Sequence, residues 1–329
     1  MLLKFFKQTL PQVIVMIALF TVLIWLRSFF SDQTYPFYFD SIKMPFYASI
    51  TSWLSNNTLY GKILAFIVML FTGFYLLQIN SKHIIIKQRT YLPTFLYLVL
   101  ISSFITLHQI NPAVFASLLF VFVFDHVLSV YHKENVLDNL FRAGFYIAIA
   151  SLFYAPAILY FIALLLSIIS IRSFNLREWF AAFFGLITPW FFYFFYHYFF
   201  NSDLLAVYRT LKLNLFTEVN NDSNGVLLYI FYAYGILLFI ISGFFLVNTL
   251  PTQKISVRKF HGAFFWFNLV SIAIIILIPS VSIEIVYIAI IPVIFQLTHY
   301  FAISNRKFWP SFLFFLMIVI SILMQFYSN

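Results

Sequence analysis

Residues 142–190 of the chain read RAGFYIAIASLFYAPAILYFIALLLSIISIRSFNLREWFAAFFGLITPW. The first apolar run in this stretch, residues 143–171, has 29 residues. About 20 helical residues are enough to cross a hydrocarbon core of about 30 Å, so the run is too long for one upright span and too short for two complete ones. Pro156 lies near its middle, where a proline removes a backbone donor and clashes with the preceding turn. The stretch therefore predicts a pair of short helices broken at Pro156.

The composition of the whole chain indicates a membrane protein. Of the 329 residues, 63% are hydrophobic and 9% are charged, compared with about 45–50% and about 25% in soluble domains. Because lipid offers no partner for exposed backbone groups, continuous apolar runs of about 20 residues are typical of helices. We therefore expect an all-α, polytopic transmembrane bundle in which residues 1–329 form a single integral membrane domain.

Eleven helical segments are expected when both halves of the broken pair are counted. They lie at about 11–30, 61–79, 91–110, 112–131, the two halves of 143–171, 179–200, 226–250, 261–278, 283–303 and 309–327. In the two longest polar loops, apolar residues recur at helical spacing over residues 46–54 and 204–215. This pattern predicts two interfacial helices that lie on the membrane surface.

The distribution of Lys and Arg decides between the two possible topologies of residues 143–171. If the run crosses once, nine Lys and Arg lie inside and ten outside; if it enters and returns, fourteen lie inside and five outside. The positive-inside bias favours the broken pair, and also explains the formal net charge of +9 without a nucleic-acid partner. We expect the N-terminus inside, the C-terminus and both interfacial helices outside, and the broken pair packed within the bundle, where other helices satisfy its backbone.

This topology brings most acidic residues to the extracytoplasmic side. Asp32 and Asp40 lie on the first outer loop, where a carboxylate can act as a general base or hold a divalent cation. The alternative is that both are solvated loop acids. Glu284 comes just before an apolar run, where a negative charge at a helix start is favoured by the helix dipole.

Asp125 and His126 lie well inside the fourth predicted span. An intramembrane acid is a functional candidate by default, because leaving it ionised against lipid is costly. Adjacent residues are about 100° apart on a helix, so a proton relay between the two side chains is not implied. Structural pairing near the inner face and a role in catalysis or transport both remain open. His261 and His299 lie near inner span ends, where polar anchoring explains them.

Several classes of chemistry are disfavoured by the sequence. The chain has no cysteine, which excludes disulfides and thiolate sites. It also lacks a Walker loop, a zinc motif, a GxSxG elbow and a dinucleotide fingerprint, so ATP-driven work and redox chemistry with soluble cofactors are disfavoured. The only cofactor that the acidic residues suggest is a divalent cation.

Five segments within residues 90–190 carry a likeness to a known membrane module: INPAV (110–114), VLSVYHKEN (127–135), AGFYIAIASLFYAPAILYF (143–161), IRSFNLREW (171–179) and ITPW (187–190). With these segments, residues 90–190 resemble the membrane module of the GT-C glycosyltransferases, which use polyprenyl-phosphate-linked sugars. The resemblance implies a GT-C-like module over residues 1–200, followed by an outer loop and four transmembrane helices over residues 201–329. The family's adjacent acidic pair in the first loop and its C-terminal soluble domain are missing here.

The resemblance also implies roles for individual residues. Asp40, or Asp32 in its place, would take the role of the family's acidic base or metal contact. His108, Asn111 and His197 would line the outer cavity. On the second predicted surface helix, Arg209 or Lys212 could meet the phosphate of the lipid carrier.

The whole chain, with RTYLP (89–93) and FNLREW (174–179), more closely resembles a family of uncharacterised inner-membrane proteins of Bacteroidota. This likeness implies a multi-pass protein of the inner membrane. Three functions are therefore expected in order of preference. The first is a transferase that moves a sugar from polyprenyl phosphate to an envelope acceptor. The second is a non-catalytic membrane scaffold that binds a membrane protein in envelope biogenesis or secretion. The third is a transporter or lipid flippase that uses Asp125.

Overall fold

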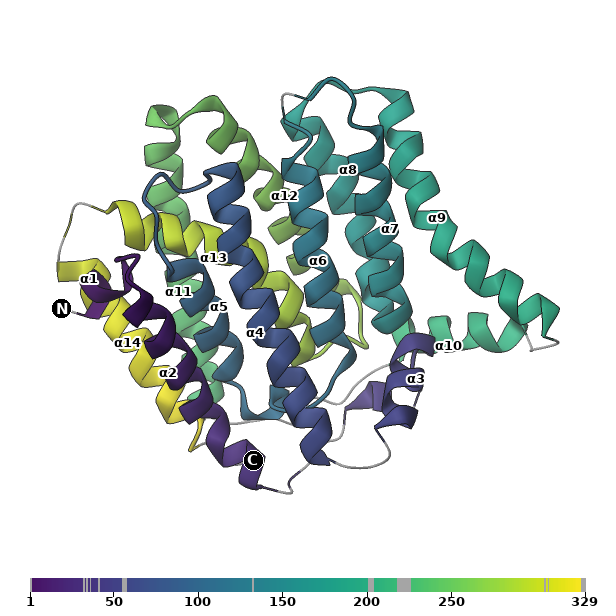
Figure 1. Cartoon of the computed structure of the whole chain (residues 1–329), viewed down its shortest axis with the longest axis horizontal. Helices are drawn as coiled ribbons and strands as arrows, with labels where there is room; N and C mark the ends of the chain where they lie inside the picture. The colour runs from purple at the N-terminus through teal and green to yellow at the C-terminus, as the bar shows by residue number, and fades with distance from the viewer. Residues whose placement is uncertain are drawn as a thin grey trace.

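The protein is described by a computed structural model that covers residues 2–31, 33, 35, 37–40, 42–54, 58–131, 133–200, 204–217, 226–304, 306 and 308–326. Within these residues the chain forms only α-helices and short 3-10 helices, with no strand (Figure 1). The predicted all-α class is therefore confirmed for the part of the chain that is described.

Fourteen α-helices occur in the described residues. They are α1 (Leu2–Phe6), α2 (Pro11–Phe30), α3 (Pro45–Trp53), α4 (Thr58–His83), α5 (Leu92–Ser102), α6 (Pro112–Leu128), α7 (Leu137–Phe153), α8 (Tyr160–Ile171), α9 (Leu176–Phe199), α10 (Leu204–Phe216), α11 (Val226–Thr249), α12 (Ile255–Leu277), α13 (Val286–Ile303) and α14 (Phe308–Met324). The short 3-10 helices are η1 (Tyr38–Asp40), η2 (Ile105–Leu107), η3 (Ala155–Leu159), η4 (Leu250–Thr252) and η5 (Ile283–Ile285).

Six helical segments are long and apolar enough to cross a membrane, which supports a membrane protein. They are Pro11–Phe30, Thr58–His83, Leu176–Phe199, Val226–Thr252, Ile255–Leu277 and Ile283–Ile303. Four shorter apolar helices, Leu92–Ser102, Pro112–Leu128, Ala155–Ile171 and Phe308–Met324, accompany them. A helix occurs at each of the eleven expected positions. That all eleven cross the membrane stays a prediction.

The break at Pro156 is confirmed. The residue before η3, Tyr154, has an extended backbone with φ −134° and ψ 103°, which ends α7 before the proline. After η3 the chain runs back beside α7. Arg172, at the end of α8, therefore comes close to the residues that precede α7 and donates to the Lys133 carbonyl at 3.1 Å. The two halves therefore form a hairpin.

The first half of the hairpin starts earlier than the apolar run suggested. α7 begins at Leu137, six positions before residue 143. Asp138 lies in its first turn, where the helix dipole favours an acidic side chain, and it pairs with Arg142 one turn later at 2.9 Å. A charged first turn thus extends the helix beyond its apolar part.

Glycines bring α7 and α9 into close contact. A Cβ atom added at Gly144 of α7 would lie 2.1 Å from the Ala182 carbonyl oxygen of α9. A Cβ atom added at Gly185 of α9 would likewise lie 2.1 Å from the Phe141 carbonyl oxygen of α7. Only glycine leaves room for this backbone approach, so the pair of glycines fixes the position of α9 against the hairpin.

α5 is shorter than the predicted span over residues 91–110. All of its residues are buried, and it ends at Ser102. The Ser102 carbonyl accepts hydrogen bonds from Gln325 Nε2 at 2.7 Å and from His108 Nε2 at 2.8 Å. Because side chains satisfy this carbonyl, the helix can end inside the bundle rather than at its surface.

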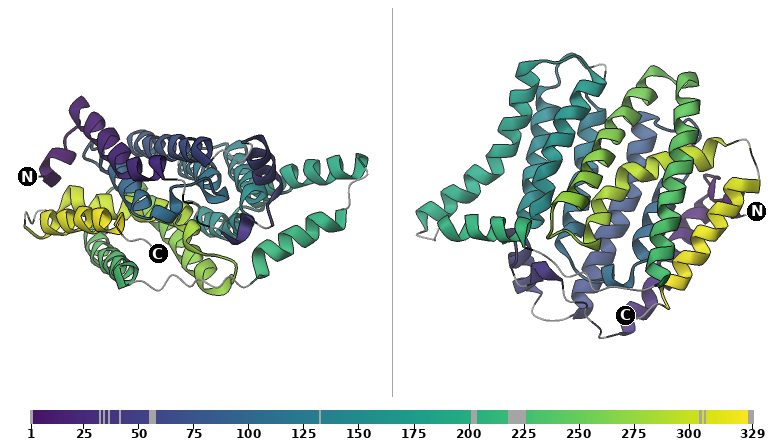
Figure 2. Two further views of the ribbon diagram at one scale, coloured as in Figure 1. Left: turned by 90° about the horizontal axis from the view of Figure 1, so that it is seen from below. Right: turned by 180° about the vertical axis from the view of Figure 1, so that it is seen from behind.

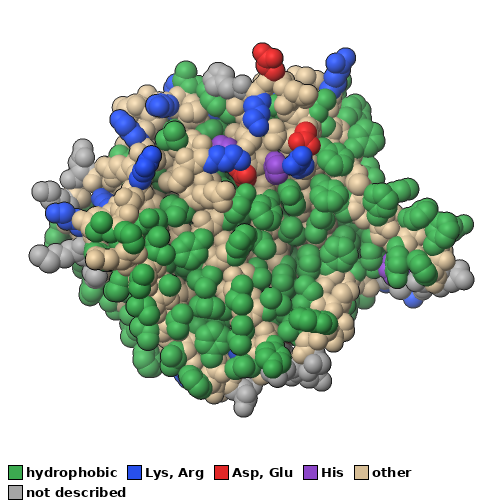
Figure 3. All heavy atoms as spheres, in the orientation of Figure 1, with side chains coloured by type: hydrophobic (Ala, Val, Ile, Leu, Met, Phe, Trp, Pro, Cys, Tyr) green, Lys and Arg blue, Asp and Glu red, His purple; other side chains and the backbone are tan. Residues whose placement is uncertain are grey.

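The bundle has two chemically different ends. Lys and Arg side chains gather over one end of the face shown in Figure 3, and hydrophobic side chains cover most of the rest. We call this end, where α4 and α8 end and α7 begins, the basic end. Lys82 lies in the last turn of α4, Arg142 pairs with Asp138 in the first turn of α7, and Arg172 and Lys259 bind backbone carbonyls before α7 and at the end of α8. The opposite end, called the Asp40 end, carries η1, α3, η2, η3, α10 and η5 (Figures 1 and 2). Assigning the basic end to the cytoplasm stays a prediction.

α9 and α10 form an arm that leaves the bundle at the Asp40 end. α9 contains Pro189. Its far half diverges from α7, while α10 returns to the bundle (Figures 1 and 2). The two predicted interfacial segments, residues 46–54 and 204–215, are helical as α3 and α10. Their position on a membrane surface stays a prediction.

Candidate functional site

Asp40 lies at the end of η1 with its carboxylate held by two donors. Asp40 Oδ2 accepts a hydrogen bond from the Phe37 amide at 3.0 Å, and Oδ1 accepts one from the Tyr47 hydroxyl at 3.3 Å. The residue is exposed. Loss of hydration around the carboxyl raises the pKa of Asp40, and the Phe37 amide, the Tyr47 hydroxyl and the Lys43 charge oppose this increase. The result is an accessible carboxylate of increased basicity.

Tyr47 anchors this carboxylate to the bundle. It lies on α3, and Pro45 is the first residue of this helix. The backbone N–H at this position would have no partner within the helix, so a proline is tolerated there. The Tyr47 ring is buried, and its hydroxyl lies 3.3 Å from the Ile110 carbonyl oxygen as well as from Asp40. Burial raises the pKa of the Tyr47 hydroxyl, and the Asp40 charge raises it further, so Tyr47 remains a donor.

α10 is attached to the same segment. Asn214 Nδ2 donates to the Ile42 carbonyl at 2.9 Å, and the Ser280 hydroxyl donates to the Asn214 carbonyl at 2.6 Å. The apolar side of α10 packs with α3 on residues around the Pro156 break. This small core contains Met44, Ala148, Leu152, Ala155, Trp190, Val207 and Leu215. The two helices α3 and α10, called the lateral helices, thus both pack against the broken pair.

Arg209 and Lys212 are exposed on α10, on the helix that Asn214 ties to the Asp40 segment. Asp32 lies outside the described residues, as do Asp203, Glu218 and Asp222. Among the described residues, no group of three His, Asp or Glu side chains could hold a metal ion. Of the predicted residues at this end, Asp40, Arg209 and Lys212 are therefore the accessible charged ones.

His108 is buried in a polar cluster between α2, α4 and α5. Its Nδ1 accepts from the Ser28 hydroxyl at 2.7 Å, its Nε2 donates to the Ser102 carbonyl, and its ring stacks on Trp25 at 4.3 Å. Burial lowers the pKa of His108 to about 3, and the nearby Lys62 charge lowers it further. The histidine is therefore neutral and fully engaged.

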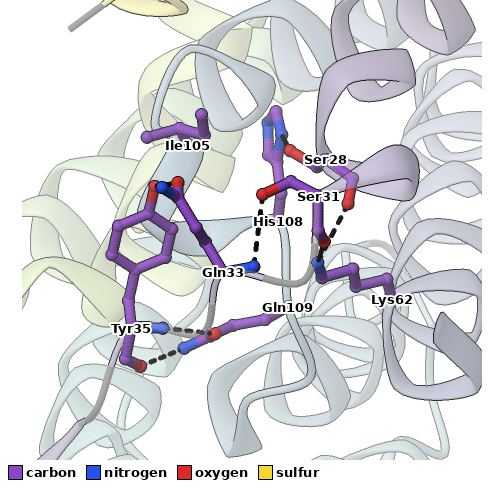
Figure 4. A pocket seen from close by; sticks show the side chains of 8 residues that line it. All are labelled: Ser28, Ser31, Gln33, Tyr35, Lys62, Ile105, His108 and Gln109. Carbon is purple, nitrogen blue, oxygen red and sulfur yellow. Dashed lines mark hydrogen bonds between the residues drawn. The ribbon is translucent and has the colours of Figure 1, made fainter. Parts of the chain in front are cut away.

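The cavity beside His108 is very small (Figure 4). Its volume is about 10 Å³, which is about the space that one water molecule requires. Lys62 lines it and donates to the carbonyl oxygens of Ser28 and Ser31. The Gln109 side chain accepts a hydrogen bond from the Tyr35 amide and donates one to the Tyr35 carbonyl. This cluster joins helix ends and has no room for a sugar.

Asn111 and His197 lie in different surroundings. Asn111 is the N-cap of α6, where its Oδ1 accepts from the Val114 amide at 3.0 Å. His197 lies on the α9 arm, with its ring 4.5 Å from that of Tyr193. Its Nδ1 has no hydrogen-bond partner within the described part of the chain. The structure brings Asn111 and His108 to one turn, but it does not bring His197 to them.

Asp125 is an ion-paired residue at the basic end. Its carboxylate lies 2.8 Å from Lys82 Nζ and 2.8 Å from His83 Nε2, and the Tyr75 hydroxyl donates to it at 3.3 Å. His126 faces elsewhere, with its Nδ1 3.4 Å from Asn139 Oδ1. The two adjacent residues therefore use separate partners, as their helical spacing implied.

The sequence identified Glu284 as a helix-start acid but did not predict that its carboxylate is buried at the Asp40 end. Glu284 is 1% exposed and accepts from the Tyr154 hydroxyl and the Ser282 amide, both at 3.0 Å, and also from the Ser282 hydroxyl. Tyr154 is the residue at the Pro156 break, so this contact ties the broken pair to the start of α13. The helix-start position of Glu284 was visible in the sequence, but a partner 130 residues away was not.

Comparison with known proteins assigns a family. A family model described as a family of unknown function, DUF6427, matches residues 42–329, which is most of the chain. The chain belongs to this family. The match begins after Asp32 and Asp40, and it includes Tyr47, the broken pair, and Arg209 and Lys212 on α10. No curated protein and no solved structure matches the chain.

Proposed function

We propose that the protein is a transferase that moves a sugar from a polyprenyl-phosphate carrier to an envelope acceptor at the Asp40 end. The observation that carries this proposal is the exposed Asp40 carboxylate, fixed by Tyr47 and Phe37 beside two lateral helices. In this proposal the Asp40 end faces the extracytoplasmic side of the inner membrane. A lipid-linked donor would reach the site along the membrane surface, where the apolar sides of α3 and α10 would lie.

The proposed reaction needs a base and an anion-binding group. The acceptor hydroxyl loses its proton to Asp40, and its oxygen forms a bond to the anomeric carbon. The bond between that carbon and the phosphate oxygen breaks, and polyprenyl phosphate leaves. Arg209 and Lys212 are two exposed cations on α10 that could stabilise the leaving phosphate, since a guanidinium binds phosphate oxygens in a bidentate manner. Inversion at the anomeric carbon follows from this single displacement.

A second function is favoured by the α9 arm. Beyond Pro189 this helix exposes aromatic side chains in succession, including Phe192 at 63%, Tyr198 at 70% and Phe199 at 64%. Aromatic residues are enriched in protein interfaces and in membrane-interface belts. A non-catalytic scaffold would use this arm to hold a membrane protein partner. Asp125 is paired with Lys82 and His83, so we assign it to structure rather than to transport.

The transferase proposal is tested with Asp40→Asn, compared with Asp138→Asn as a matched control. Asp138 is an exposed acid at the basic end, paired with Arg142, and its loss should leave glycan and glycolipid profiles unchanged. Asp40→Asn removes the base and should reduce product formation by about 100-fold or more. Tyr47→Phe keeps the ring but loses one hydrogen bond to the base, so a smaller reduction is expected.

Two outcomes contradict the proposal. The first is an unchanged glycolipid profile in Asp40→Asn and also in the double variant Asp32→Asn, Asp40→Asn. The second is the loss of a co-purifying membrane protein after alanine substitution of Phe192 and Phe199, with no change in glycolipids in any variant. The second result would establish the scaffold function.

A further inference from the structure

An open hollow lies at the basic end, in the loop that joins α8 to α9. It is lined by the consecutive residues 172–178, and its volume is about 460 Å³. This volume falls within the range of about 300–1,000 Å³ that is typical of ligand sites. Figure 1 shows the loop at the top of the bundle, where the loop between α6 and α7 also lies. This site, called the α8–α9 hollow, is therefore at the opposite end of the bundle from Asp40.

Contacts on two sides hold the Arg172 side chain in place. Its Nε atom lies 3.3 Å from Glu178 Oε1, and its Nη1 atom donates to the Lys133 carbonyl at 3.1 Å. The Glu178 side chain is buried at 4% exposure, whereas the Arg172 side chain is 29% exposed. Within the described part of the chain, these contacts leave the N–H groups of Arg172 Nη2 without a hydrogen-bond partner. A guanidinium held in this way loses little further freedom when it binds a ligand.

Arg177 gives the hollow a second guanidinium, and its side chain is exposed. The first-turn amides of α9 are already occupied by Asn175. The Asn175 side chain accepts from the Arg177 amide at 3.1 Å, and the Asn175 carbonyl accepts from the Glu178 and Trp179 amides. The groups that remain for an anion are therefore the two arginine side chains rather than the helix start.

The charges around the hollow favour an anion. Lys133 is exposed beside the carbonyl that Arg172 binds, and Lys259 donates to the backbone at the end of α8. Among the described residues that line the hollow, the acid is Glu178, whose charge Arg172 offsets. A headgroup with a positive amine would meet like charges here. A phosphate without an amine would be attracted, because guanidinium groups bind phosphate oxygens in a bidentate manner.

Apolar side chains on the same segment indicate that the phosphate belongs to a lipid. Phe174 is 56% exposed and Leu176 is 60% exposed, and both line the hollow. Phe180, one turn further along α9, is 56% exposed as well. α9 is long and apolar enough to cross a membrane, so its first turn would lie at the membrane surface. Arginines beside exposed apolar residues are typical of this interface, where the charged groups reach lipid phosphates.

We propose that the α8–α9 hollow binds the phosphate of an anionic phospholipid, a phosphodiester lipid whose headgroup carries no amine. Arg172 and Arg177 donate to the phosphate oxygens, and the acyl chains extend along α9 past Phe180. A water-soluble phosphate shares the same charged group, but it would leave Phe174 and Leu176 in contact with water. The site does not depend on the proposed transferase, because it lies at the other end of the bundle.

The test uses the full-length protein in phosphatidylcholine nanodiscs with two photoactivatable probes. Both carry a diazirine at the same acyl carbon; one is an anionic phosphatidylglycerol and the other a zwitterionic phosphatidylcholine. We expect the phosphatidylglycerol probe to label peptides from residues 171–184 saturably, and the phosphatidylcholine probe to label them only without saturation. An excess of glycerol phosphate, which is water-soluble, should not displace the anionic probe.

Substitutions of exposed arginines separate a defined site from general surface charge. Arg177→Gln should increase the probe concentration for half-maximal labelling about tenfold, because it removes charge-assisted hydrogen bonds to the phosphate. Arg177→Lys keeps the charge but loses the bidentate geometry, so a smaller increase is expected. Arg258→Gln is the matched control, since Arg258 is an exposed residue in the first turn of α12 that does not line the hollow. This control should label like the wild type.

Four results would overturn the proposal: saturable labelling by the zwitterionic probe, unchanged labelling of Arg177→Gln, an equal effect of Arg258→Gln, or displacement of the anionic probe by glycerol phosphate. The last result would assign the hollow to a water-soluble phosphate instead of a lipid. Because Arg177 is exposed, its substitution should leave the fold intact. Asp40→Asn should leave labelling unchanged, so this site and the proposed transferase can fail independently.

Discussion

At the scale of single residues, several polar side chains of this chain close helix ends. Lys62 donates to the carbonyl oxygens of Ser28 and Ser31, where α2 ends, and Arg27 donates to the Gln325 carbonyl, where α14 ends. The last carbonyls of a helix lack partners and carry partial negative charge, which cations stabilise. The five predicted outer cations are Arg27, Lys43, Lys62, Arg209 and Lys212. Arg27 and Lys62 thus stabilise helix ends, which leaves Lys43 beside Asp40 and Arg209 and Lys212 on α10 as the exposed cations at this end.

His108 provides a pH-dependent test of this buried cluster. Burial lowers the pKa of His108 to about 3 in the folded protein, compared with 6.5 in the unfolded chain. The unfolded state therefore gains a proton as pH falls below 6.5 while the folded state does not, and stability decreases toward low pH. Between pH 7 and pH 5 the wild type should lose about 2 kcal/mol from this residue. His108→Gln should show a smaller loss, measured as the thermal unfolding midpoint in detergent.

The control for this measurement is Ser49→Ala, a change at an exposed residue of α3. It should keep the pH dependence of the wild type. An identical loss of stability between pH 7 and pH 5 in the wild type and in His108→Gln would show that His108 is protonated in the folded state.

Some of these residue roles could be predicted from the sequence and others could not. Asn111 before Pro112 is a local signal for a helix start, and its capping bond spans only three residues. The contact between Tyr154 and Glu284 depends on how the broken pair packs against α13, and no local pattern carries that information. The sequence identifies Asp40 as an acid on a polar loop. Its hydrogen bond from Tyr47 could not be predicted, because it depends on where α3 packs.

At the scale of helices, the contact between α7 and α9 depends on two glycines. Gly144→Ala would force its Cβ against the Ala182 carbonyl, which is backbone and cannot move independently of α9. Overpacking of this kind typically costs about 1–3 kcal/mol, and we expect at least that loss for Gly144→Ala. The free energy of unfolding in detergent, measured with denaturant, checks this value.

Gly235 on α11 offers a matched comparison, because an added Cβ there would meet no atom within 4 Å. Gly235→Ala should be neutral or stabilising by up to about 1 kcal/mol, since alanine loses less conformational entropy in a helix. Equal destabilisation by the two substitutions would show that the close packing of α7 on α9 does not contribute to stability.

The helices themselves were predicted with uneven success. Pro156 is a local breaker, so the broken pair could be read directly from the sequence. The early end of α5 at Ser102 could not, because it depends on Gln325 and His108, which reach it from a distant helix and from the following turn. Apolar length alone overestimates a helix whose end is buried among polar side chains.

At the scale of the whole molecule, the two ends of the bundle should face opposite sides of the membrane. The chain contains no cysteine, so single cysteine substitutions report one position each. Ser49→Cys at the Asp40 end should react with a membrane-impermeant maleimide on intact cells. Glu134→Cys at the basic end should react only after the membrane is permeabilised. Reversed labelling would place Asp40 in the cytoplasm and remove the envelope acceptor from the proposal.

The proposed transferase function requires the protein to bind a polyprenyl-phosphate-linked sugar. The most direct measurement is mass spectrometry of the full-length protein after gentle detergent extraction. We predict that a polyprenyl phosphate or its sugar conjugate is retained by the wild type and is depleted in the double variant Arg209→Gln, Lys212→Gln. Absence of any polyprenyl phosphate from wild-type protein that still retains other membrane lipids would contradict the proposed transferase function.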